Sequence, residues 1–434
     1  MEKSKVRVGI IHAYPNTYLI KSLQKVGCKL VLFVPQRPAF DCSNLEAVIE
    51  VPLHEPSVVV EKVADYHQQK PLDVLLPVYE GATAITAKAA EVLGLPGVKF
   101  SGAQASRNKY LAYQRWSEQG IPVPITVPIR DPDQGWQDIE THIGYPAMIK
   151  LADSMNSQGV IKVTSKDDYL DGIQHLLRML ERPVDLDLQT DRNRLAYGTS
   201  QIKIIAQEYC PGTEVAVDCI VTQGKSQILG IFEKAPATGP YFAEKMSISP
   251  TSLSKEEVEK VSQIAADAVL ALTAEQSSAG HVEIRFTREG PKVLEAGLRP
   301  GGAYTVAAVE YLTGINPYVE LLNVLLGNEL SVVRSNEKAI LYGGIVIPKS
   351  GVLTSVQGLD IFESISELLD VKILNQPGER VYCLPESAQP HFAYYLIGGV
   401  SREEVLDKHR LIQESIRLEI SDFLAENKTM EMAL

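Results

Sequence analysis

The chain has 434 residues, of which 45% are hydrophobic and 22% charged, and it carries a formal net charge of −12. A chain of this length is too long for one small core and predicts two to four domains or subdomains. The acidic balance argues against a broad nucleic-acid-binding surface, although local basic sites for phosphate groups are compatible with it.

The cysteines and the apolar segments favour a cytoplasmic protein. The five cysteines are odd in number and form no Cys-x-x-Cys pair, which is the usage of a reducing compartment. The apolar run at 8–11 is too short for a signal-peptide core, and no run approaches the length of a membrane-spanning helix. We therefore expect no membrane partner.

The N-terminal segment 1–100 has the pattern of an open parallel α/β domain. Apolar runs at 6–11 and 29–34 flank a helical stretch, which favours a right-handed βαβ unit. A further strand precedes Glu80, and ligands of such sheets bind at the carboxyl ends of the strands. Glu80 is therefore either a substrate-binding carboxylate suited to an ammonium group or a solvated loop residue. No G-x-G-x-x-G follows the first strand, so the pattern does not indicate a dinucleotide-binding domain.

The next unit begins with a helix and continues with a small polar loop. Ser106 is expected to cap a helix at 107–119, and Lys109 in its first turn opposes the helix dipole unless an anion is near. The segment 144–163 predicts two strands whose connecting loop can offer N–H groups and hydroxyls to phosphate oxygens. It lacks the Gly-Lys-Ser/Thr of a Walker motif, which excludes that class of ATPase.

Two further segments are candidates for binding small molecules. Strand-like runs at 202–207 and 213–218 flank a Pro-Gly turn and predict a hairpin-like pair. Cys210 in this turn is expected to line a site rather than act as a nucleophile, because no paired base is evident. The Pro/Gly/aromatic loop at 233–247, which includes Lys234, is a candidate pocket for a substrate.

The stretch 281–302 carries the densest set of candidate functional residues. Two strand-like segments flank a turn-forming Thr-Arg-Glu-Gly-Pro and predict a β-hairpin, in which Glu283 lies opposite Glu295. Like charges opposed across a strand pair are destabilising, and a divalent cation between them reverses the sign of the interaction. Hard oxygen ligands of this kind suit Mg²⁺, with Mn²⁺ as the alternative. A surface hairpin with solvated glutamates is the competing interpretation.

Residues around these glutamates extend the candidate site. Arg299 can place a rigid, cationic guanidinium group on a substrate phosphate that binds the same metal ion. Gly301 and Gly302 allow the backbone to approach a ligand closely. His281 shares a strand face with Glu283. It is either a residue that orients a substrate carboxylate or a structural histidine.

The ordered set of motifs resembles the ATP-grasp superfamily, the ATP-dependent carboxylate–amine ligases. The resemblance implies an ATP-grasp fold in which Glu283 and Glu295 bind Mg²⁺ and Arg299 contacts the transferred phosphate. It also implies the residues that bind ATP. The phosphates contact Lys109 at the start of the helix and, in the lid, Lys150, Ser154, Ser157 and Gly159. The backbone of the hinge, Glu208, Tyr209 and Cys210, binds adenine, and Glu214 binds the ribose.

One position departs from the superfamily pattern. Most members have Glu-x-Asn-x-Arg, whereas Gly297 holds the Asn position here, so one metal ligand of the pattern is missing. L-amino acid ligases of the bacilysin-synthetase type also carry a small residue there, and the chain resembles that subgroup. The resemblance implies an ADP-forming ligase that joins two amino acids, or an amino acid and a related acid, through an acyl phosphate. Catalytic roles are then expected for Arg299, Lys234 and His281, and substrate binding for Glu80, Arg299, Gly301 and Gly302.

The expected architecture is α/β with an α+β lid and three domains. These are an N-terminal α/β domain at 1–100, an ATP-grasp domain at 101–330 with its lid at about 145–207, and a small mixed domain at 331–434. The last resembles the C-terminal domain of biotin-carboxylase-like proteins, and the polar segment 181–200 predicts a long connection on the lid. The expected partners are small-molecule amino acids, without nucleic acid, and a homodimer is left open.

Two alternative functions share parts of this pattern. A biotin- or purine-type carboxylase would use the same ATP site with bicarbonate as acceptor, although the chain has no Ala-Met-Lys-Met biotinyl site and would need a separate carrier. A nucleotide-binding regulator without chemistry is the second alternative. The intact set of Glu283, Glu295 and Arg299 argues against it.

Overall fold

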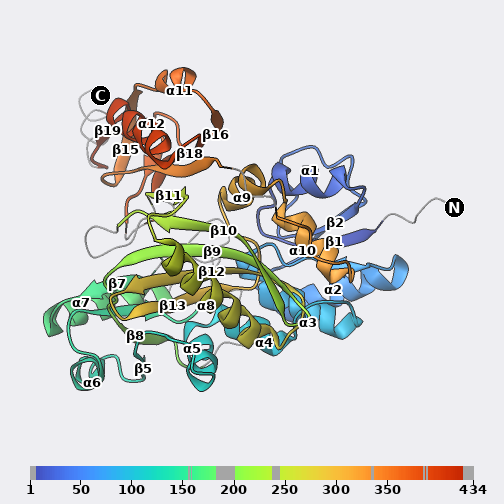
Figure 1. Cartoon of the computed structure of the whole chain (residues 1–434), viewed down its shortest axis with the longest axis horizontal. Helices are drawn as coiled ribbons and strands as arrows, with labels where there is room; N and C mark the ends of the chain where they lie inside the picture. Colours follow the sequence, from blue (N-terminus) through green and yellow to red (C-terminus); the bar gives the residue numbers. More distant parts are fainter. Residues whose placement is uncertain are drawn as a thin grey trace, which may run out of the picture.

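The computed structural model describes residues 6–154, 157, 159–181, 201–236, 245–333, 337–384, 387 and 390–423. Residues 182–200 of the predicted connection on the lid lie outside these residues. Residues 237–244, in the middle of the predicted loop at 233–247, also lie outside them. Figure 1 shows the N-terminal part in blue and the C-terminal part in orange and red on either side of helix α9 (Thr305–Thr313), with the lid in green-blue at the opposite end of a large central sheet.

The N-terminal part is an open, parallel α/β sheet, as the sequence predicts. Its strands pair in the order β3-β2-β1-β4, all in parallel register, and Glu80 follows the carboxyl end of the last strand. The elements are β1 Arg7–Ile11, α1 Thr17–Lys25, β2 Lys29–Val34, β3 Ala47–Glu50, α2 Pro56–Gln69, β4 Val74–Leu75, the short 3₁₀ helix η1 Glu80–Ala82 and α3 Thr83–Leu93.

Two helices, not one, connect this part to the lid. They are α4 Phe100–Arg107 and α5 Lys109–Glu118, separated by Asn108. The predicted cap at Ser106 is wrong, because its hydroxyl donates to the carbonyl of Ala103 within α4. Asn108 caps α5 instead, since its side chain accepts from the N–H groups of Tyr110 and Leu111. Lys109 remains at the first position of a helix, as expected.

The lid is a four-stranded antiparallel sheet with the order β5-β8-β6-β7. Helices α6 and α7 pack on it and bury one face. The bounds are β5 Thr126–Ile129, α6 Gly135–His142, β6 Ala147–Leu151, β7 Val160–Val163, α7 Lys166–Glu181 and β8 Ile204–Glu208. The lid sheet therefore includes a strand that precedes the segment 145–207 expected for it.

The central sheet has eight strands in the order β13-β12-β9-β10-β11-β14-β18-β16. Helix α8 covers its first strands. The sheet continues across residue 330, the predicted boundary between the ATP-grasp domain and the C-terminal domain, because β11 pairs with β14 (Figure 1). The bounds are β9 Thr213–Thr222, β10 Lys225–Lys234, β11 Met246–Ser249, α8 Lys255–Thr273, β12 Ser278–Thr287, β13 Gly290–Gly297, β14 Ala339–Val346, β16 Leu368–Ile373 and β18 His391–Gly399. The predicted hairpin is confirmed, with Glu283 directly opposite Glu295.

The remaining elements tie the parts together. Helices α9 and α10 share one hydrophobic core with the N-terminal sheet, β9, β10, β14 and β18. A small sheet, β17-β15-β19, completes the C-terminal part with helices α11 and α12. The bounds are α9 Thr305–Thr313, α10 Pro317–Leu325, β15 Gly351–Gln357, α11 Ile361–Ser364, β17 Arg380–Val381, α12 Arg402–Ser415 and β19 Arg417–Ser421.

The structure confirms the predicted fold class, with a parallel α/β sheet, an antiparallel lid and a mixed C-terminal part. Among the described residues, no helix combines the length and apolar character that crossing a membrane would require. All five cysteines are free thiols.

Candidate active site

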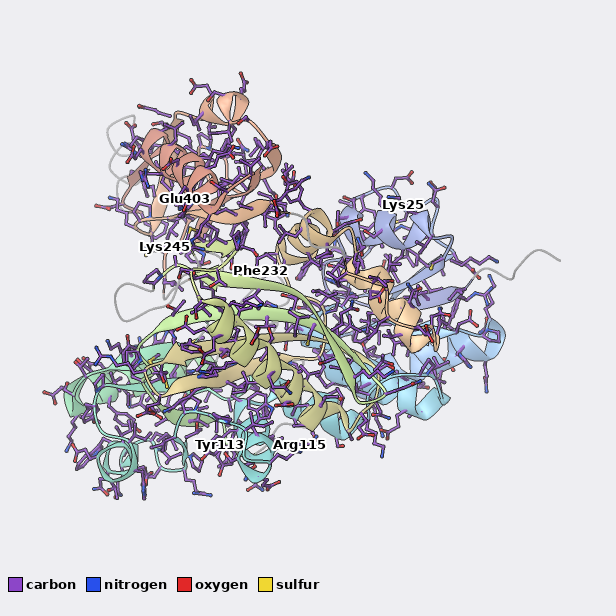
Figure 2. The ribbon with its side chains drawn as sticks, in the orientation of Figure 1. Lys25, Tyr113, Arg115, Phe232, Lys245 and Glu403 are labelled. Atoms are coloured by element: carbon purple, nitrogen blue, oxygen red, sulfur yellow. The ribbon has the colours of Figure 1, made fainter. Side chains whose placement is uncertain are left out.

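A cavity of about 1150 Å³ lies where the lid, the central sheet, the N-terminal part and the C-terminal strands meet. Figure 2 labels Phe232, one of its lining residues, at the centre of the molecule, where β10 passes beneath α9. All of the predicted site residues line this cavity except Gly159 and Gly301. Residues separated by more than 200 positions in the sequence are thus brought to one place.

The two hairpin glutamates face each other on neighbouring strands of the sheet. Glu283 lies on β12 opposite Glu295 on β13, and each contacts a lysine. Lys234 Nζ lies 2.5 Å from Glu283 Oε1, and Lys109 Nζ lies 3.2 Å from Glu295 Oε2. Burial alone would raise the pKa of Glu283, but Lys234 and His281 outweigh it and bring the pKa to about 2. Glu283 is therefore ionised at neutral pH.

These two carboxylates fit a magnesium site that is completed by phosphate oxygens. Within the described ranges, no group of three or more His, Cys, Asp or Glu side chains is arranged to hold a metal. Mg²⁺ typically uses one or two protein carboxylates together with substrate phosphates and water, so a pair of opposed glutamates is a sufficient protein contribution. The lysines beside both glutamates would also attract the phosphates.

Two buried amines form the cationic part of the cavity. Lys109 Nζ donates to the carbonyl of Ser154 at 2.6 Å, and Lys150 Nζ donates to Gln207 Oε1 at 2.6 Å. Burial and the neighbouring Lys109 lower the pKa of Lys150 to about 8. Glu295, 3.2 Å from Lys109 Nζ, offsets part of the repulsion between the two ammonium groups, and a bound polyanion would offset more of it.

The loop between β6 and β7 contributes its predicted residues unequally. Ser154 is buried and Ser157 is exposed, and both line the cavity. Gly159 adopts a left-handed conformation with φ +59°, and a Cβ there would lie 2.7 Å from Leu151 Cγ. Gly159 therefore lets the backbone at its own position pack on the lid core, and it is not among the residues that line the cavity.

The predicted hinge lies at the end of β8. Glu208 is held by its side chain, because its carboxylate accepts from Lys292 Nζ at 2.8 Å and from the N–H of Ile125 at 3.1 Å. Lys162 Nζ lies 4.0 Å from the ring centroid of Tyr209. Burial and the carboxylate of Glu208 raise the pKa of Cys210 to about 11, which leaves the thiol protonated at neutral pH and unsuited to nucleophilic attack.

Glu214 lies between two cations. It accepts a hydrogen bond from Arg285 Nη2, and its other oxygen lies 3.5 Å from Lys234 Nζ. Lys234 therefore bridges Glu214 and Glu283, and the predicted ribose-binding residue is linked to the predicted metal site. The register of β12 and β9, in which Arg285 is opposite Glu214, accounts for this proximity.

Glu80 is more constrained than an open ammonium-binding residue. Its Oε1 accepts from Arg107 Nη1 at 2.6 Å and its Oε2 from Arg299 Nε at 2.5 Å, and Glu80 is 6% exposed. Burial opposes ionisation, but the charges of Arg299 and Arg107 bring the pKa of Glu80 to about 2. The sequence-based expectation of an ammonium site overlooked these guanidinium groups. In the structure Glu80 holds Arg299 in the cavity.

The glycine that departs from the superfamily pattern lies against Glu80. A Cβ at Gly297 would lie 2.6 Å from Glu80 Oε2, which is closer than van der Waals contact permits. The carboxylate of Glu80 thus fills the space into which a side chain at position 297 would project. The buried Glu80–Arg299 ion pair in this geometry therefore requires a glycine at position 297.

Asp218 is a site residue that the sequence analysis missed. It is 2% exposed, its Oδ2 lies 3.0 Å from His281 Nδ1, and its Oδ1 accepts the N–H of Gly301 at 2.8 Å. A Cβ at Gly301 would lie 2.7 Å from Asp218 Oδ1, so the glycine permits this contact. The strand period offered a signal, because Asp218 follows Glu214 by four residues and shares its face.

Comparison with known proteins agrees with this geometry. Two family models match the chain, an ATP-grasp N-terminal domain over residues 24–97 and an ATP-grasp domain over residues 143–306. The carbamoyl phosphate synthase large chain of Caldanaerobacter subterraneus subsp. tengcongensis is 23% identical over 86% of this chain and 32% of its own length. The alanine–anticapsin ligase of Bacillus subtilis is 24% identical over 62% of this chain and 57% of its own length. The chain thus spans about a third of the first relative and just over half of the second.

A solved structure shares the fold over nearly the whole chain. The L-amino acid ligase from Bacillus licheniformis superposes with a TM-score of 0.81, covering 97% of this chain and 100% of that one, at 22% sequence identity. The two family matches together span more than half of the chain, and their order follows that of the N-terminal sheet, the lid and the hairpin. The chain belongs to the ATP-grasp superfamily.

Proposed function

We propose that the protein is an ADP-forming carboxylate–amine ligase that joins two amino acids, or an amino acid and a related acid, through an acyl phosphate. The observation that carries the proposal is the convergence of Glu283, Glu295 and Arg299 with two buried lysines in one cavity. This set provides what phosphoryl transfer from ATP to a carboxylate requires, namely positioning of the phosphates and stabilisation of developing charge.

The reaction has two steps, each assisted by residues of the cavity. A substrate carboxylate oxygen attacks the γ-phosphorus of ATP and ADP leaves. The amine nitrogen of the second substrate then attacks the acyl carbon, loses a proton, and phosphate leaves. Lys109 and Lys150 orient the phosphates, and Arg299, fixed by Glu80, stabilises the transferred group. Mg²⁺ held by Glu283 and Glu295 would neutralise phosphate charge when bound.

The remaining assignments belong to the same proposal. The backbone at 208–210 binds adenine, Glu214 binds the ribose, and Ser154 and Ser157 contact the phosphates. His281, oriented by Asp218, contacts a substrate carboxylate, and Lys234 lies near the acyl group. We also propose a division into domains at 1–100, 101–330 and 331–434, a cytoplasmic location, and Mn²⁺ as an alternative metal. The free thiols support the location.

The test is phosphate release from ATP and Mg²⁺ with a matrix of paired amino acids, with and without bicarbonate, followed by mass analysis. Release that needs two amino acids, with a product lighter than their sum by one water, is the expected result. Release that follows bicarbonate alone would assign the protein to the carboxylase branch and overturn the proposal.

The pKa of Lys150 predicts how ATP affinity depends on pH. The ammonium form binds phosphate, and it is lost as the pH rises through about 8. If the bound form stays protonated, linkage predicts that the Kd of a non-hydrolysable ATP analogue rises about tenfold between pH 7 and pH 9. Isothermal titration calorimetry would measure this change. Lys150→Arg should flatten the profile, since arginine keeps its charge, and a flat profile for the unmodified protein would contradict the assignment.

The contact between Gly297 and Glu80 predicts the effect of a single methyl group. Gly297→Ala places a Cβ 2.6 Å from Glu80 Oε2, so the carboxylate must move and Arg299 moves with it. We expect kcat for phosphate release to fall at least about tenfold, with little change in ATP affinity. Gly224→Ala, in the turn between β9 and β10, is the control: its φ of +72° makes an alanine there cost some stability, but the new Cβ meets only Glu275 Cδ at 3.9 Å and Gly224 does not line the cavity, so kcat should not change. Equal kcat values for the two variants would refute the role given to Glu80.

A further inference from the structure

Gln207 is a buried amide on the cavity face of the lid. It lies on β8, is 4% exposed and lines the cavity. Ala206, the residue before it, packs in the hydrophobic core of the lid, so the alternation of the strand turns Gln207 to the opposite face. A polar side chain in such a place is costly unless its hydrogen bonds are satisfied. The partners of Gln207 therefore indicate what it does.

The strand register places Gln207 between two other buried polar residues. On one side, Thr126 of β5 is directly opposite Gln207. On the other side, Met148 of β6 is directly opposite, so Lys150, two residues further along β6, is the diagonal neighbour. Long side chains can reach diagonal neighbours on one face of a sheet. Thr126, Gln207 and Lys150 thus form a row across the lid.

The hydrogen bonds of this row fix the direction in which the Gln207 amide points. Thr126 Oγ1 donates to the carbonyl of Pro124 at 3.0 Å, and with its lone pairs it accepts from Gln207 Nε2 at 3.0 Å. At the other end, Gln207 Oε1 accepts from Lys150 Nζ at 2.6 Å. A reversed amide would place its NH₂ group against the ammonium group, where both groups can only donate. Thr126 therefore keeps the carbonyl oxygen of Gln207 directed at Lys150.

The neutral charge of the amide matters for the cation that it holds. Gln207 orients the ammonium group of Lys150 without cancelling its charge, whereas a carboxylate in the same place would form an ion pair and weaken its attraction for a phosphate. An ammonium group has three N–H donors, so one hydrogen bond to Gln207 leaves two for phosphate oxygens. Both ends of the Gln207 amide are engaged, which favours an action through Lys150 over direct contact with a ligand.

We propose that Gln207, fixed by Thr126, is a positioning residue that holds the Lys150 ammonium group toward the nucleotide phosphates and keeps its charge available to them. The inference rests on the proposed function, which assigns Lys150 to phosphate binding, and extends it to two residues that act through Lys150. A lysine that is already ordered before the nucleotide binds loses less conformational entropy on binding. Thr126 does not line the cavity, so its substitution tests positioning alone.

The test is isothermal titration calorimetry of the full chain with Mg²⁺ and the β,γ-imido analogue of ATP, with adenosine measured by competition. Thr126→Val keeps the shape of the side chain and removes the hydroxyl, so the Gln207 amide can turn away from Lys150. We expect the Kd of the analogue to rise about five- to tenfold, while that of adenosine, which has no phosphate, stays within about twofold. Gln207→Glu should raise the Kd of the analogue at least about tenfold, because the carboxylate neutralises Lys150.

Three further variants separate positioning from a general structural effect. Thr126→Ser retains the hydroxyl and should bind the analogue like the unmodified protein. Thr222→Val is the matched control, since it removes a hydroxyl of β9 that lies 2.8 Å from Ser277 Oγ, and Thr222 does not line the cavity. Thr126→Val should have no further effect when Lys150 is replaced with Met, because the group that it positions is then absent. Circular dichroism would confirm that each variant folds.

Three results would overturn the inference. They are an unchanged Kd in Thr126→Val, an equal loss of affinity for adenosine and the analogue, and a full effect of Thr126→Val in the Lys150→Met background. Phosphate release that depends on amino acids, together with an ineffective Thr126→Val substitution, refutes only the inference. An unmodified protein that binds adenosine as tightly as the analogue has no phosphate site at Lys150, and this result refutes both the inference and the proposed function.

Discussion

Replacing Glu295 with Gln is expected to reduce phosphate release by about 100- to 1000-fold, the effect typical of removing one group that stabilises a transition state electrostatically. The amide keeps the size of the side chain, and its oxygen can take the place of Glu295 Oε2, which lies 3.2 Å from Lys109 Nζ. It removes the negative charge that, with Glu283, would hold Mg²⁺ against the phosphates. The change should therefore act on kcat while the fold is retained.

The control for this variant lies on the same hairpin. Glu289→Gln changes a glutamate in the turn whose side chain is 77% exposed and which contacts Lys292 at 3.1 Å. Its rate of phosphate release should stay within about twofold of the unmodified protein, because an exposed ion pair contributes little. A Glu295→Gln variant as active as this control would contradict the proposed metal site. If the Glu295→Gln variant keeps the cellular function of the protein, the protein is a nucleotide-binding regulator.

Glu80→Ala is expected to lower the free energy of unfolding by about 3–5 kcal/mol, the cost of leaving a buried charge without its partner. Arg107 is 2% exposed, and Glu80 Oε1 is the acceptor 2.6 Å from its Nη1. Two other nitrogens of this guanidinium group, Nε and Nη2, already lack a hydrogen-bond partner. Loss of Glu80 would therefore leave a buried cation with little compensation.

Urea denaturation followed by circular dichroism would measure the loss. Glu403→Ala is a suitable comparison, because Glu403 is an exposed glutamate on α12, labelled on the C-terminal part in Figure 2, and does not line the cavity. The midpoint of this control should match that of the unmodified protein. The double variant Glu80→Ala/Arg107→Met should recover part of the loss, since it removes the unpaired charge. A Glu80→Ala midpoint equal to that of the control would mean that the ion pair contributes nothing.

Local patterns were sufficient to predict the hairpin and its register. Alternation along β12 and β13 and the turn composition between them place Glu283 opposite Glu295, and the structure has this pairing. The same reasoning erred at Ser106, because Asn108, two residues further on, is an equally good capping residue and is the one that caps the helix. Because neighbouring residues determine short-range geometry, errors in predicting it are shifts of one or two positions.

Long-range contacts could not be predicted in this way. Glu80 meets Arg107 at a separation of 27 residues and Arg299 at a separation of 219. No periodicity connects such positions, because the contact depends on how the N-terminal sheet docks on the central one. For the same reason the sequence did not reveal that the rings of Tyr342 and Tyr394 lie 5.6 Å apart, which follows from the pairing of β14 with β18.

The unbroken sheet from β13 to β16 bears on how the substrate range of such a protein can change in evolution. Exchange of residues 331–434 with another protein would cut the ladder between β11 and β14, where Ser247 pairs with Tyr342, and expose strand edges that promote aggregation. Single substitutions on the cavity face of β14, β16 or β18 leave every backbone hydrogen bond in place. New specificities are therefore expected to arise by point mutation on one sheet face rather than by recombination of whole modules.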